Sequence, residues 1–191
     1  MTAPVLGDDG LLRCPWGDAP ADYRAYHDQE WGRPVRDERG LFERLSLEAF
    51  QSGLSWLTIL RKRERFREAF AGFDPAAVAA FADGDVARLM ADAGIVRNRA
   101  KVAATIGNAR AVLALDRPLS ELLWSYAPSA AERGAPVTLA DVPAATPEST
   151  ALARELRLRN FRFLGPTTAY ALMQATGMVD DHLLGCHARN R

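Results

Sequence analysis

The sequence predicts an all-α fold, because apolar residues recur at helical spacing along almost the whole chain. No run of strict two-residue alternation is long enough to form a sheet. Candidate capping residues precede several of the apolar runs, as expected where helices begin. We therefore expect one helical domain over residues 12–187, with an N-terminal tail over 1–11 and a C-terminal tail over 188–191.

Two helices are predicted in the first part of the domain. Leu41, Leu45 and Ala49 repeat every four residues after Asp37, a candidate N-cap. A second helix begins near Ser55. Its apolar stripe consists of Ile59, Phe66, Phe70 and Phe73.

Shorter helices are predicted to follow. Asp74-Pro75 supplies an N-cap and a first-turn proline, and Asp85 begins another helix that Gly94 ends. A longer helix is marked by Val102, Ile106, Ala109 and Leu113. Residues 122–126 form a short one.

The last third of the domain starts with a connection. Residues 127–146 are rich in proline and small residues, but they are too few to separate independent domains. A helix over 147–159, a turn over 160–165 and a helix over 167–176 follow, and Gly177 closes the last helix.

Composition excludes several classes of protein. The 191 residues carry 24 basic and 24 acidic side chains, so a nucleic acid would have to meet a local patch of charge. No stretch approaches about 20 consecutive apolar residues, and we expect no membrane span. The first residues lack the pattern of a signal peptide, and two cysteines make no disulfide scaffold. We expect a cytoplasmic protein.

Both cysteines and two of the three histidines lie near the ends of the chain. Cys14 precedes His27, while His182 and Cys186 are four residues apart, which on a helix places them on one face. Two thiolates and two imidazoles are the ligands of a closed, structural zinc site, which here would join the two ends. The alternative is two buried thiols and ordinary surface histidines, and His187 is a rival fourth ligand.

Aromatic residues are concentrated near the N-terminus. Three of the four tryptophans fall within the first 56 residues, beside tyrosines of the segment 23–32. Core packing is the usual role of such rings, but a pocket that stacks a flat, electron-poor base needs the same residues. The candidates are Trp16, Tyr23, Tyr26, Trp31 and Trp56.

Glu48 lies at the edge of an apolar helical stripe, three residues after Leu45. A carboxylate at such a position is either paired or placed in a pocket where its charge is used. The alternatives are a rim position in contact with water and a salt bridge to Arg44.

Residues 160–172 read as the end of a helix, a glycine-containing hairpin and the start of another helix. Gly165 permits a tight backbone turn, and the N–H groups that open the next helix could face a phosphate. Such contacts bind DNA without reading its sequence. The alternative is a helical hairpin that only packs.

Several motifs occur together and in a fixed order over about residues 12–187. They are residues 13–16, 23–32, 47–48, 51–56, 92–95, 106–110 and 163–186. In this combination the chain resembles the 3-methyladenine DNA glycosylase I family, within the helix-hairpin-helix DNA glycosylase superfamily. The resemblance implies two helical lobes around one cleft, a DNA-binding hairpin and a zinc staple that joins the N- and C-terminal segments.

The resemblance also implies roles for individual residues. One structural zinc ion would be held by Cys14, His27, His182 and Cys186. Glu48 would contact the flipped, alkylated adenine. The pocket would be lined by Tyr26 and Trp56, with Trp16, Tyr23 and Trp31 as further wall residues. Leu54 follows Gly53 and would be a wedge that enters the gap left by the base.

The activity implied by the resemblance belongs to base-excision repair. The enzyme, a monomer, would hydrolyse the N-glycosidic bond of 3-methyladenine in double-stranded DNA, releasing free 3-methyladenine and leaving an abasic site. Thr167 stands where strand-cleaving relatives carry a lysine nucleophile, so we expect no lyase activity. Asp180 stands where the superfamily has a catalytic aspartate and is a candidate to stabilise the sugar cation or to activate water. Its alternative role is a helix N-cap.

Local residues are expected to contact DNA, and basic ones above all, because the net charge is zero. The basic candidates are Arg97, Arg99 and Lys101, which follow Gly94-Ile95, and Arg162 in the hairpin before the last helix. Gly165 and Thr167 of that hairpin are further candidates. Two other classes of protein remain open at this point. A non-catalytic DNA-binding protein would have no need of a pocket carboxylate, and a zinc hydrolase would need an open metal position.

Overall fold

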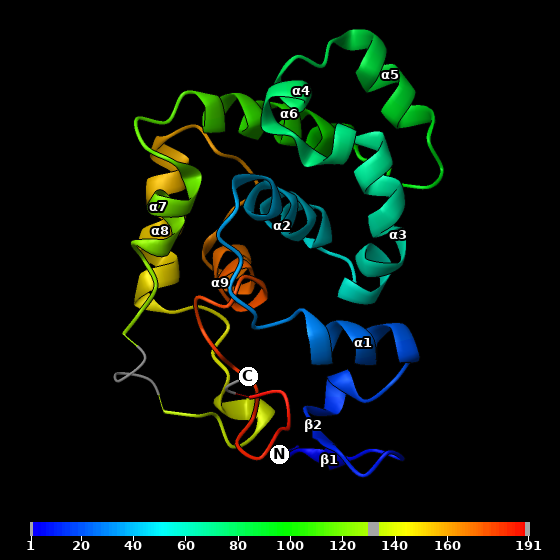
Figure 1. Ribbon diagram of the computed structural model, residues 1–191. Helices are drawn as coiled ribbons and strands as arrows, with labels where there is room; N and C mark the ends of the chain where they lie inside the picture. Colours follow the sequence, from blue (N-terminus) through cyan, green and yellow to red (C-terminus); the bar gives the residue numbers. More distant parts are fainter. Residues whose placement is uncertain (1, 130–133, 190–191) are drawn as a thin grey trace.

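A computed structural model describes residues 2–129 and 134–189. Most of these residues are helical, which confirms the predicted helical class (Figure 1). In chain order the α-helices of the described residues are α1 (Ala21–Gln29), α2 (Glu38–Gln51), α3 (Trp56–Ala69), α4 (Pro75–Ala79), α5 (Asp83–Ala91), α6 (Arg99–Leu113), α7 (Leu119–Trp124), α8 (Pro147–Leu158) and α9 (Pro166–Ala175). Shorter elements are the 3-10 helices η1 (Pro15–Gly17), η2 (Ala71–Phe73) and η4 (Leu139–Asp141) and the strands β1 (Val5–Leu6) and β2 (Leu12–Arg13).

The predicted N-caps form as side-chain hydrogen bonds. Asp37 accepts a hydrogen bond from the backbone N–H of Gly40 at 2.7 Å, and Ser55 accepts one from Thr58 at 3.2 Å. Asp74 caps α4 in the same way. Helix α5 begins two residues before the predicted start, and α1 was not predicted.

The N-terminal residues differ from the expected tail, since β1 pairs antiparallel with β2 and places Val5 opposite Arg13. The guanidinium of Arg13, which is 2% exposed, donates to both carboxylate oxygens of Asp9 at 2.8 and 2.6 Å. This charge pairing fixes the turn between β1 and β2, which contains Asp9, against Arg13 of β2. The expected C-terminal tail includes residues 190 and 191, and the expected connection includes 130–133, which lie outside the described residues.

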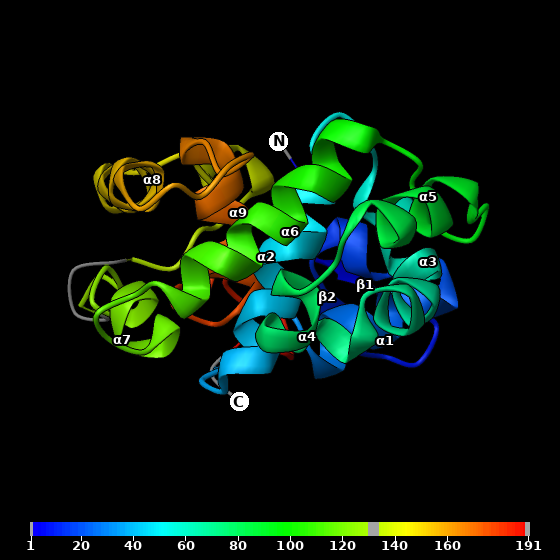
Figure 2. The ribbon, with the colours of Figure 1, turned by 90° about the horizontal axis from the view of Figure 1, so that it is seen from above.

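Helix α2 forms the centre of the fold and is buried along most of its length. It packs against α3, α6, α7 and α9, and α6 crosses over it (Figures 1 and 2). Phenylalanines fill much of the surrounding core: Phe42, Phe50, Phe66, Phe70 and Phe73. A polar side chain on α2 is therefore taken away from water unless a cavity reaches it.

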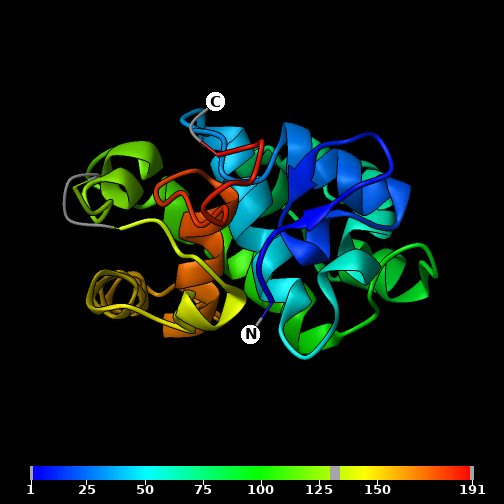
Figure 3. The ribbon, with the colours of Figure 1, turned by 90° about the horizontal axis from the view of Figure 1, so that it is seen from below.

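Residues 12–14, near the start of the chain, lie beside residues 182–187, near its end (Figures 1 and 3). The backbone N–H of His187 donates to the carbonyl of Leu12 at 2.8 Å. Gly177 ends α9 with a φ of +72°, and a Cβ there would come within 2.6 Å of the Arg33 backbone, so glycine is required twice over. No helix in the described ranges has the length and apolar character needed to cross a membrane.

Candidate functional site

A cavity of about 350 Å³ lies where η1, α1, α2, α3 and α9 meet. Its aromatic wall is formed by Trp16, Tyr23, Tyr26, Trp31 and Trp56. The remaining lining residues are Glu48, Gln51, Leu139, Val142, Ala171, Gln174 and Asp181. The structure thus brings all six side chains predicted to contact a base to one cavity, whose size is that of a small-molecule site.

The aromatic rings hold one another in edge-on and tilted contacts. The ring centroids of Trp16 and Trp31 are 4.8 Å apart at 84°, and those of Trp16 and Tyr23 are 5.1 Å apart at 50°. Tyr26 and Trp56 are 5.3 Å apart. Such pairs stabilise each other beyond the area they bury. The wall is preorganised to receive a flat ligand, and its ring faces favour a cationic one.

Glu48 brings an acidic group into this aromatic surrounding from the last turn of α2. It is 5% exposed, and no described residue donates a hydrogen bond to its carboxyl group. Burial raises the pKa of Glu48 to about 8, while the charge of Arg44 acts in the opposite direction. The salt bridge to Arg44 that was the alternative role of Glu48 does not form, because Arg44 donates to Glu30 at 2.9 Å instead.

A second acidic residue of the cavity was not predicted. Asp181 is 2% exposed, and its Oδ2 accepts hydrogen bonds from Gln174 Nε2 at 2.9 Å and from the Tyr170 hydroxyl. The neighbouring Asp180 is absent from the cavity lining, and its Oδ1 accepts from the backbone N–H of His182 at 3.1 Å. Adjacent aspartates give no sequence signal that says which one faces a cavity.

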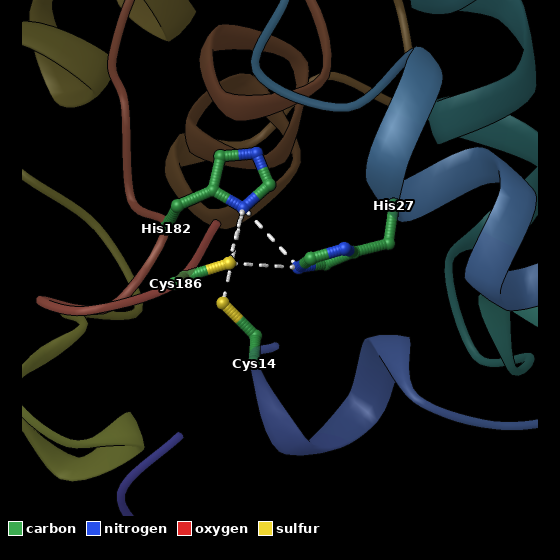
Figure 4. A group of neighbouring side chains, drawn as sticks. All are labelled: Cys14, His27, His182 and Cys186. Atoms are coloured by element: carbon green, nitrogen blue, oxygen red, sulfur yellow. Dashed lines mark hydrogen bonds between the residues drawn. The ribbon is translucent and has the colours of Figure 1, made fainter. Parts of the chain in front are cut away.

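The four predicted metal ligands converge on one point beside the aromatic wall (Figure 4). His182 Nδ1 lies 3.2 Å from His27 Nε2, 3.7 Å from Cys186 Sγ and 3.8 Å from Cys14 Sγ, and all four residues are buried. Cys186 Sγ is 3.5 Å from His27 Nε2. This cluster, called the Cys/His cluster below, could hold a metal ion.

The C-terminal pair of ligands does not lie on a helix. Residues 182–186 form an irregular segment with a turn at 184–185, in which the N–H of Cys186 donates to the carbonyl of Leu183 at 2.9 Å. His187, the rival ligand, lies outside the cluster, and its Nε2 is 2.9 Å from Asp28 Oδ1.

Partners outside the Cys/His cluster orient its two imidazoles. The Nδ1–H of His27 donates to Asp28 at 2.7 Å, and the Nε2–H of His182 donates to the carbonyl of Trp31 at 3.1 Å. These bonds leave His27 Nε2 and His182 Nδ1 as the nitrogens that face the cluster. Burial works against the charge of Asp28, but hydrogen bonds from Arg13, His27 and His187 hold its pKa well below the usual range. Each imidazole is thereby prepared to bind a metal through one defined nitrogen.

Close backbone packing also supports the cluster. Gly17, the last residue of η1, lies so near to His27 that an added Cβ would be 2.3 Å from the imidazole. The rings of Trp16 and His27 are 5.0 Å apart, and those of Trp31 and His182 are 4.7 Å apart. The aromatic wall and the Cys/His cluster therefore share a boundary.

The residues predicted to contact DNA fall into two groups. Arg97, Arg99 and Arg162 are exposed, and no ion pair joins them to a carboxylate within the described ranges. Leu54 is 38% exposed and follows Gly53, whose φ is +81°. Lys101 differs from these, because it is 8% exposed and its amine points into the fold, where it donates to the carbonyls of Phe50 at 2.8 Å and Ser52 at 2.6 Å.

Residues 159–165 connect α8 to α9, and Gly165 is not the strained residue of this connection. Its φ is −76°, whereas Asn160 and Phe163 have φ values of 68° and 60°. The buried Asn108 holds the turn, since its amide accepts from the N–H of Arg162 at 2.8 Å and donates to the carbonyl of Arg162 at 3.1 Å. An added Cβ at Gly165 would meet nothing within 4 Å, so the backbone there is open to a partner, as is the exposed Thr167.

Comparisons with known proteins agree with this geometry. The profile of the methyladenine glycosylase family matches residues 16–190. DNA-3-methyladenine glycosylase 1 of Escherichia coli (strain K12) is 46% identical, covering 92% of this chain and 96% of its own. A crystal structure of 3-methyladenine DNA glycosylase I matches with a TM-score of 0.87 at 43% identity, covering 93% of this chain and 99% of its own.

A further solved structure carries a ligand. It is a tyrosine-to-phenylalanine variant of 3-methyladenine DNA glycosylase I in complex with 3-methyladenine, with a TM-score of 0.86 at 34% identity over 94% of this chain and 98% of its own. The fold, the cavity and these matches define an enzyme of the DNA glycosylase class. The chain belongs to the methyladenine glycosylase family.

Proposed function

We propose that this protein excises 3-methyladenine from alkylated double-stranded DNA by hydrolysing the N-glycosidic bond, which leaves an abasic site. The observation that carries this proposal is a buried carboxyl group, Glu48, that lacks a hydrogen-bond donor among the described residues and faces a cavity with five aromatic rings. The names of the relatives, and the 3-methyladenine bound to one of them, support the choice of base.

The chemistry follows from the charge of the damaged base. Methylation at N3 makes the purine cationic, and extrusion from the duplex costs a few kcal/mol, less for a damaged base. Ring faces favour the cation over neutral adenine, and the cation lowers the pKa of Glu48 so that the carboxyl group ionises beside it, which means that selection and catalysis use the same contacts. When the bond from C1′ to the base breaks, its electron pair goes to the base. A water oxygen then bonds to the cationic sugar carbon and loses its proton to solvent.

The Cys/His cluster fits a zinc ion. Tetrahedral coordination with ordinary zinc–nitrogen and zinc–sulfur lengths requires about 3.3 Å between two nitrogens and about 3.6 Å between nitrogen and sulfur. The observed separations are 3.2 Å for the nitrogens and 3.5, 3.7 and 3.8 Å for nitrogen and sulfur. We propose that Cys14, His27, His182 and Cys186 hold one structural zinc, which would join the chain ends. Because four protein ligands complete the coordination, a zinc hydrolase is disfavoured.

We also propose that the enzyme is monofunctional and acts as a monomer in the cytoplasm, with the hairpin around Gly165 on the DNA backbone as in the helix-hairpin-helix superfamily. Support for monofunctionality comes from Thr167, which is exposed at the start of α9 where a lyase would need an amine nucleophile. Borohydride treatment of the enzyme with damaged DNA should trap no covalent adduct. A trapped adduct would overturn this part of the proposal.

Base release from methylated duplex DNA tests the proposal directly. The wild-type protein should release 3-methyladenine, identified by chromatography, and Glu48→Gln should lower the single-turnover rate by about 100-fold or more. Glu43→Gln is the matched control, because Glu43 is also buried on α2 but pairs with Arg67 and does not line the cavity. It should keep most of the activity. Equal activity of Glu48→Gln and wild type would exclude the role of Glu48, and no release by a folded wild type would exclude the reaction.

The candidate role of Asp180 is tested by the same assay. Its carboxylate accepts from the His182 backbone and lies 3.9 Å from the Arg189 guanidinium, outside the cavity lining. We therefore expect Asp180→Asn to retain most of the single-turnover rate. A loss of single-turnover rate as large as that of Glu48→Gln would show that Asp180 takes part in catalysis.

A further inference from the structure

Lys101 is a buried cation that the proposed reaction does not use. It lies in the first turn of α6 and is 8% exposed, whereas lysine is rarely buried unless it is paired. Within the described residues no carboxylate forms an ion pair with it, and burial lowers its pKa. Its hydrogen bonds go to two backbone carbonyls, those of Phe50 at 2.8 Å and Ser52 at 2.6 Å.

Those two carbonyls stand at the C-terminal end of α2. The last carbonyls of an α-helix have no donor within the helix, and the helix dipole favours a cation there. Phe50 is in the last turn of α2 and Ser52 is its C-cap residue. Lys101 thus caps α2 from another helix, and it fixes the point where the chain leaves α2.

The turn that begins there connects two parts of the cavity. Residues 52–55, called the α2–α3 turn below, are closed by a hydrogen bond from the N–H of Leu54 to the carbonyl of Gln51 at 2.6 Å and by one from Gln51 Nε2 to the Leu54 carbonyl at 2.8 Å. Glu48 and Gln51 line the cavity before the turn, and Trp56 lines it directly after the turn. A shift of the turn would therefore move three lining residues and the exposed Leu54 together.

We propose that Lys101 is a positioning residue, which fixes the α2–α3 turn and thereby sets the side of the base cavity formed by Glu48, Gln51 and Trp56. This inference rests on the proposed function for the identity of the base. It replaces the phosphate contact expected from the sequence, because an ammonium that is held by two internal carbonyls does not face a DNA backbone. Arg97 and Arg99, just before and at the start of α6, remain exposed.

Two substitutions of Lys101 test the proposal. Lys101→Met keeps the length of the side chain but removes the charge and all donors, whereas Lys101→Gln keeps an amide donor. We expect Lys101→Met to weaken binding of free 3-methyladenine, measured by tryptophan fluorescence, and to slow single-turnover release, each by about tenfold. Lys101→Gln should show a smaller loss. Affinity for undamaged duplex should stay within about twofold of wild type for both.

Lys62 provides a matched control, since it is the other lysine of the chain. Its amine also donates to two carbonyls, those of Ala93 at 3.0 Å and Gly94 at 3.1 Å, but that loop carries no cavity-lining residue. Lys62→Met should leave the affinity for free 3-methyladenine unchanged. Equal loss of that affinity in both Met variants would overturn the specific role of Lys101.

Two other outcomes also overturn the proposal. If folded Lys101→Met binds free 3-methyladenine as wild type does, Lys101 does not position the cavity, whatever its effect on thermal stability. If Lys101→Met instead loses affinity for undamaged duplex and shows a smaller salt dependence, Lys101 contacts phosphate. A wild-type protein that binds the free base but releases none from DNA would refute the proposed reaction, while the binding assay would still test Lys101.

Discussion

The Cys/His cluster and the base cavity lie side by side, yet the two imidazoles of the cluster have hydrogen-bond partners, whereas one buried carboxyl group of the cavity has no donor among the described residues. In the cluster the outer nitrogen of each imidazole has a partner, the Asp28 carboxylate for His27 and the Trp31 carbonyl for His182. In the cavity no described residue donates a hydrogen bond to Glu48. Trp31 belongs to both regions, because its ring lines the cavity and its carbonyl supports the cluster.

The difference separates groups whose hydrogen bonds are made within the protein from a group that is left available to a ligand. Partnered groups around the four candidate ligands fix one geometry before any metal binds, which suits a structural site. A buried carboxyl group without a donor is costly for the folded state, and such groups are concentrated where binding or catalysis uses them. The predictions below test this contrast between partnered and unpartnered groups.

The largest effect is expected from breaking the Cys/His cluster. Cys14→Ala removes one of four candidate ligands and should lower the free energy of unfolding by several kcal/mol, because metal binding to such a site is coupled to folding. Urea unfolding of the wild type with and without a zinc chelator should show a loss of similar size. Equal unfolding curves for wild type and variant, with no zinc in the purified protein by elemental analysis, would contradict the metal site.

Substitution of Glu48, in contrast, is expected to raise the free energy of unfolding. Because its pKa is about 8 in the folded protein and near 4.5 in the unfolded chain, the unfolded state releases this proton first as the pH rises. The folded state therefore loses stability between about pH 4.5 and pH 8. Glu48→Gln abolishes this loss and should be more stable than wild type at pH 8.5, by up to a few kcal/mol.

The pH dependence provides the control for that prediction. Urea unfolding at pH 4.5 should show little difference between wild type and Glu48→Gln, since the carboxyl group is then protonated in the folded protein and still about half protonated in the unfolded chain. A difference that stays constant from pH 4.5 to pH 8.5 would show that burial does not raise the pKa of Glu48.

A smaller effect is expected from removing an outer partner of the cluster. Asp28→Asn keeps the size of the side chain but weakens its hold on the Nδ1–H of His27, and it should lower the zinc affinity by about 10- to 100-fold in a chelator competition. Asp18→Asn is the matched control, because Asp18 pairs with Arg13 and Arg24 but contacts neither imidazole. Equal zinc affinity in both variants would show that the outer partner of His27 has no influence.

Much of this arrangement could be predicted from the sequence, where the signal is local or the chemistry is distinctive. Asp37 and Ser55 mark helix starts because capping depends on a few neighbouring residues. The Cys14–His27 and His182–Cys186 pairs carry a ligand set of uncommon chemistry, although the second pair lies in an irregular segment and not on a helix.

Other features depend on the tertiary fold and carry no local signal. In the sequence nothing distinguishes Lys101 from the neighbouring arginines. Only the packing of α6 on α2 turns its amine inward. Asp181 faces the cavity while Asp180 does not, a difference of one position in an irregular segment. Asp9 and Arg13 hold the β1–β2 turn through a partly buried charge network that no periodic pattern predicts.

The smallest effect is expected from substitution of surface arginines, some of which have an ion-pair partner while others have none within the described ranges. Arg97 has no ion-pair partner in the described part of the chain, whereas Arg61 donates to Asp22 at 2.7 Å. Arg97→Ala should weaken binding of undamaged duplex by about two- to fivefold and reduce the salt slope by about one, measured by fluorescence anisotropy at several salt concentrations. Arg61→Ala should change both quantities less, because Asp22 already compensates its charge. Equal losses at the two positions would show that the overall charge of the surface attracts DNA, and the distinction between partnered and unpartnered groups would then hold only in the interior.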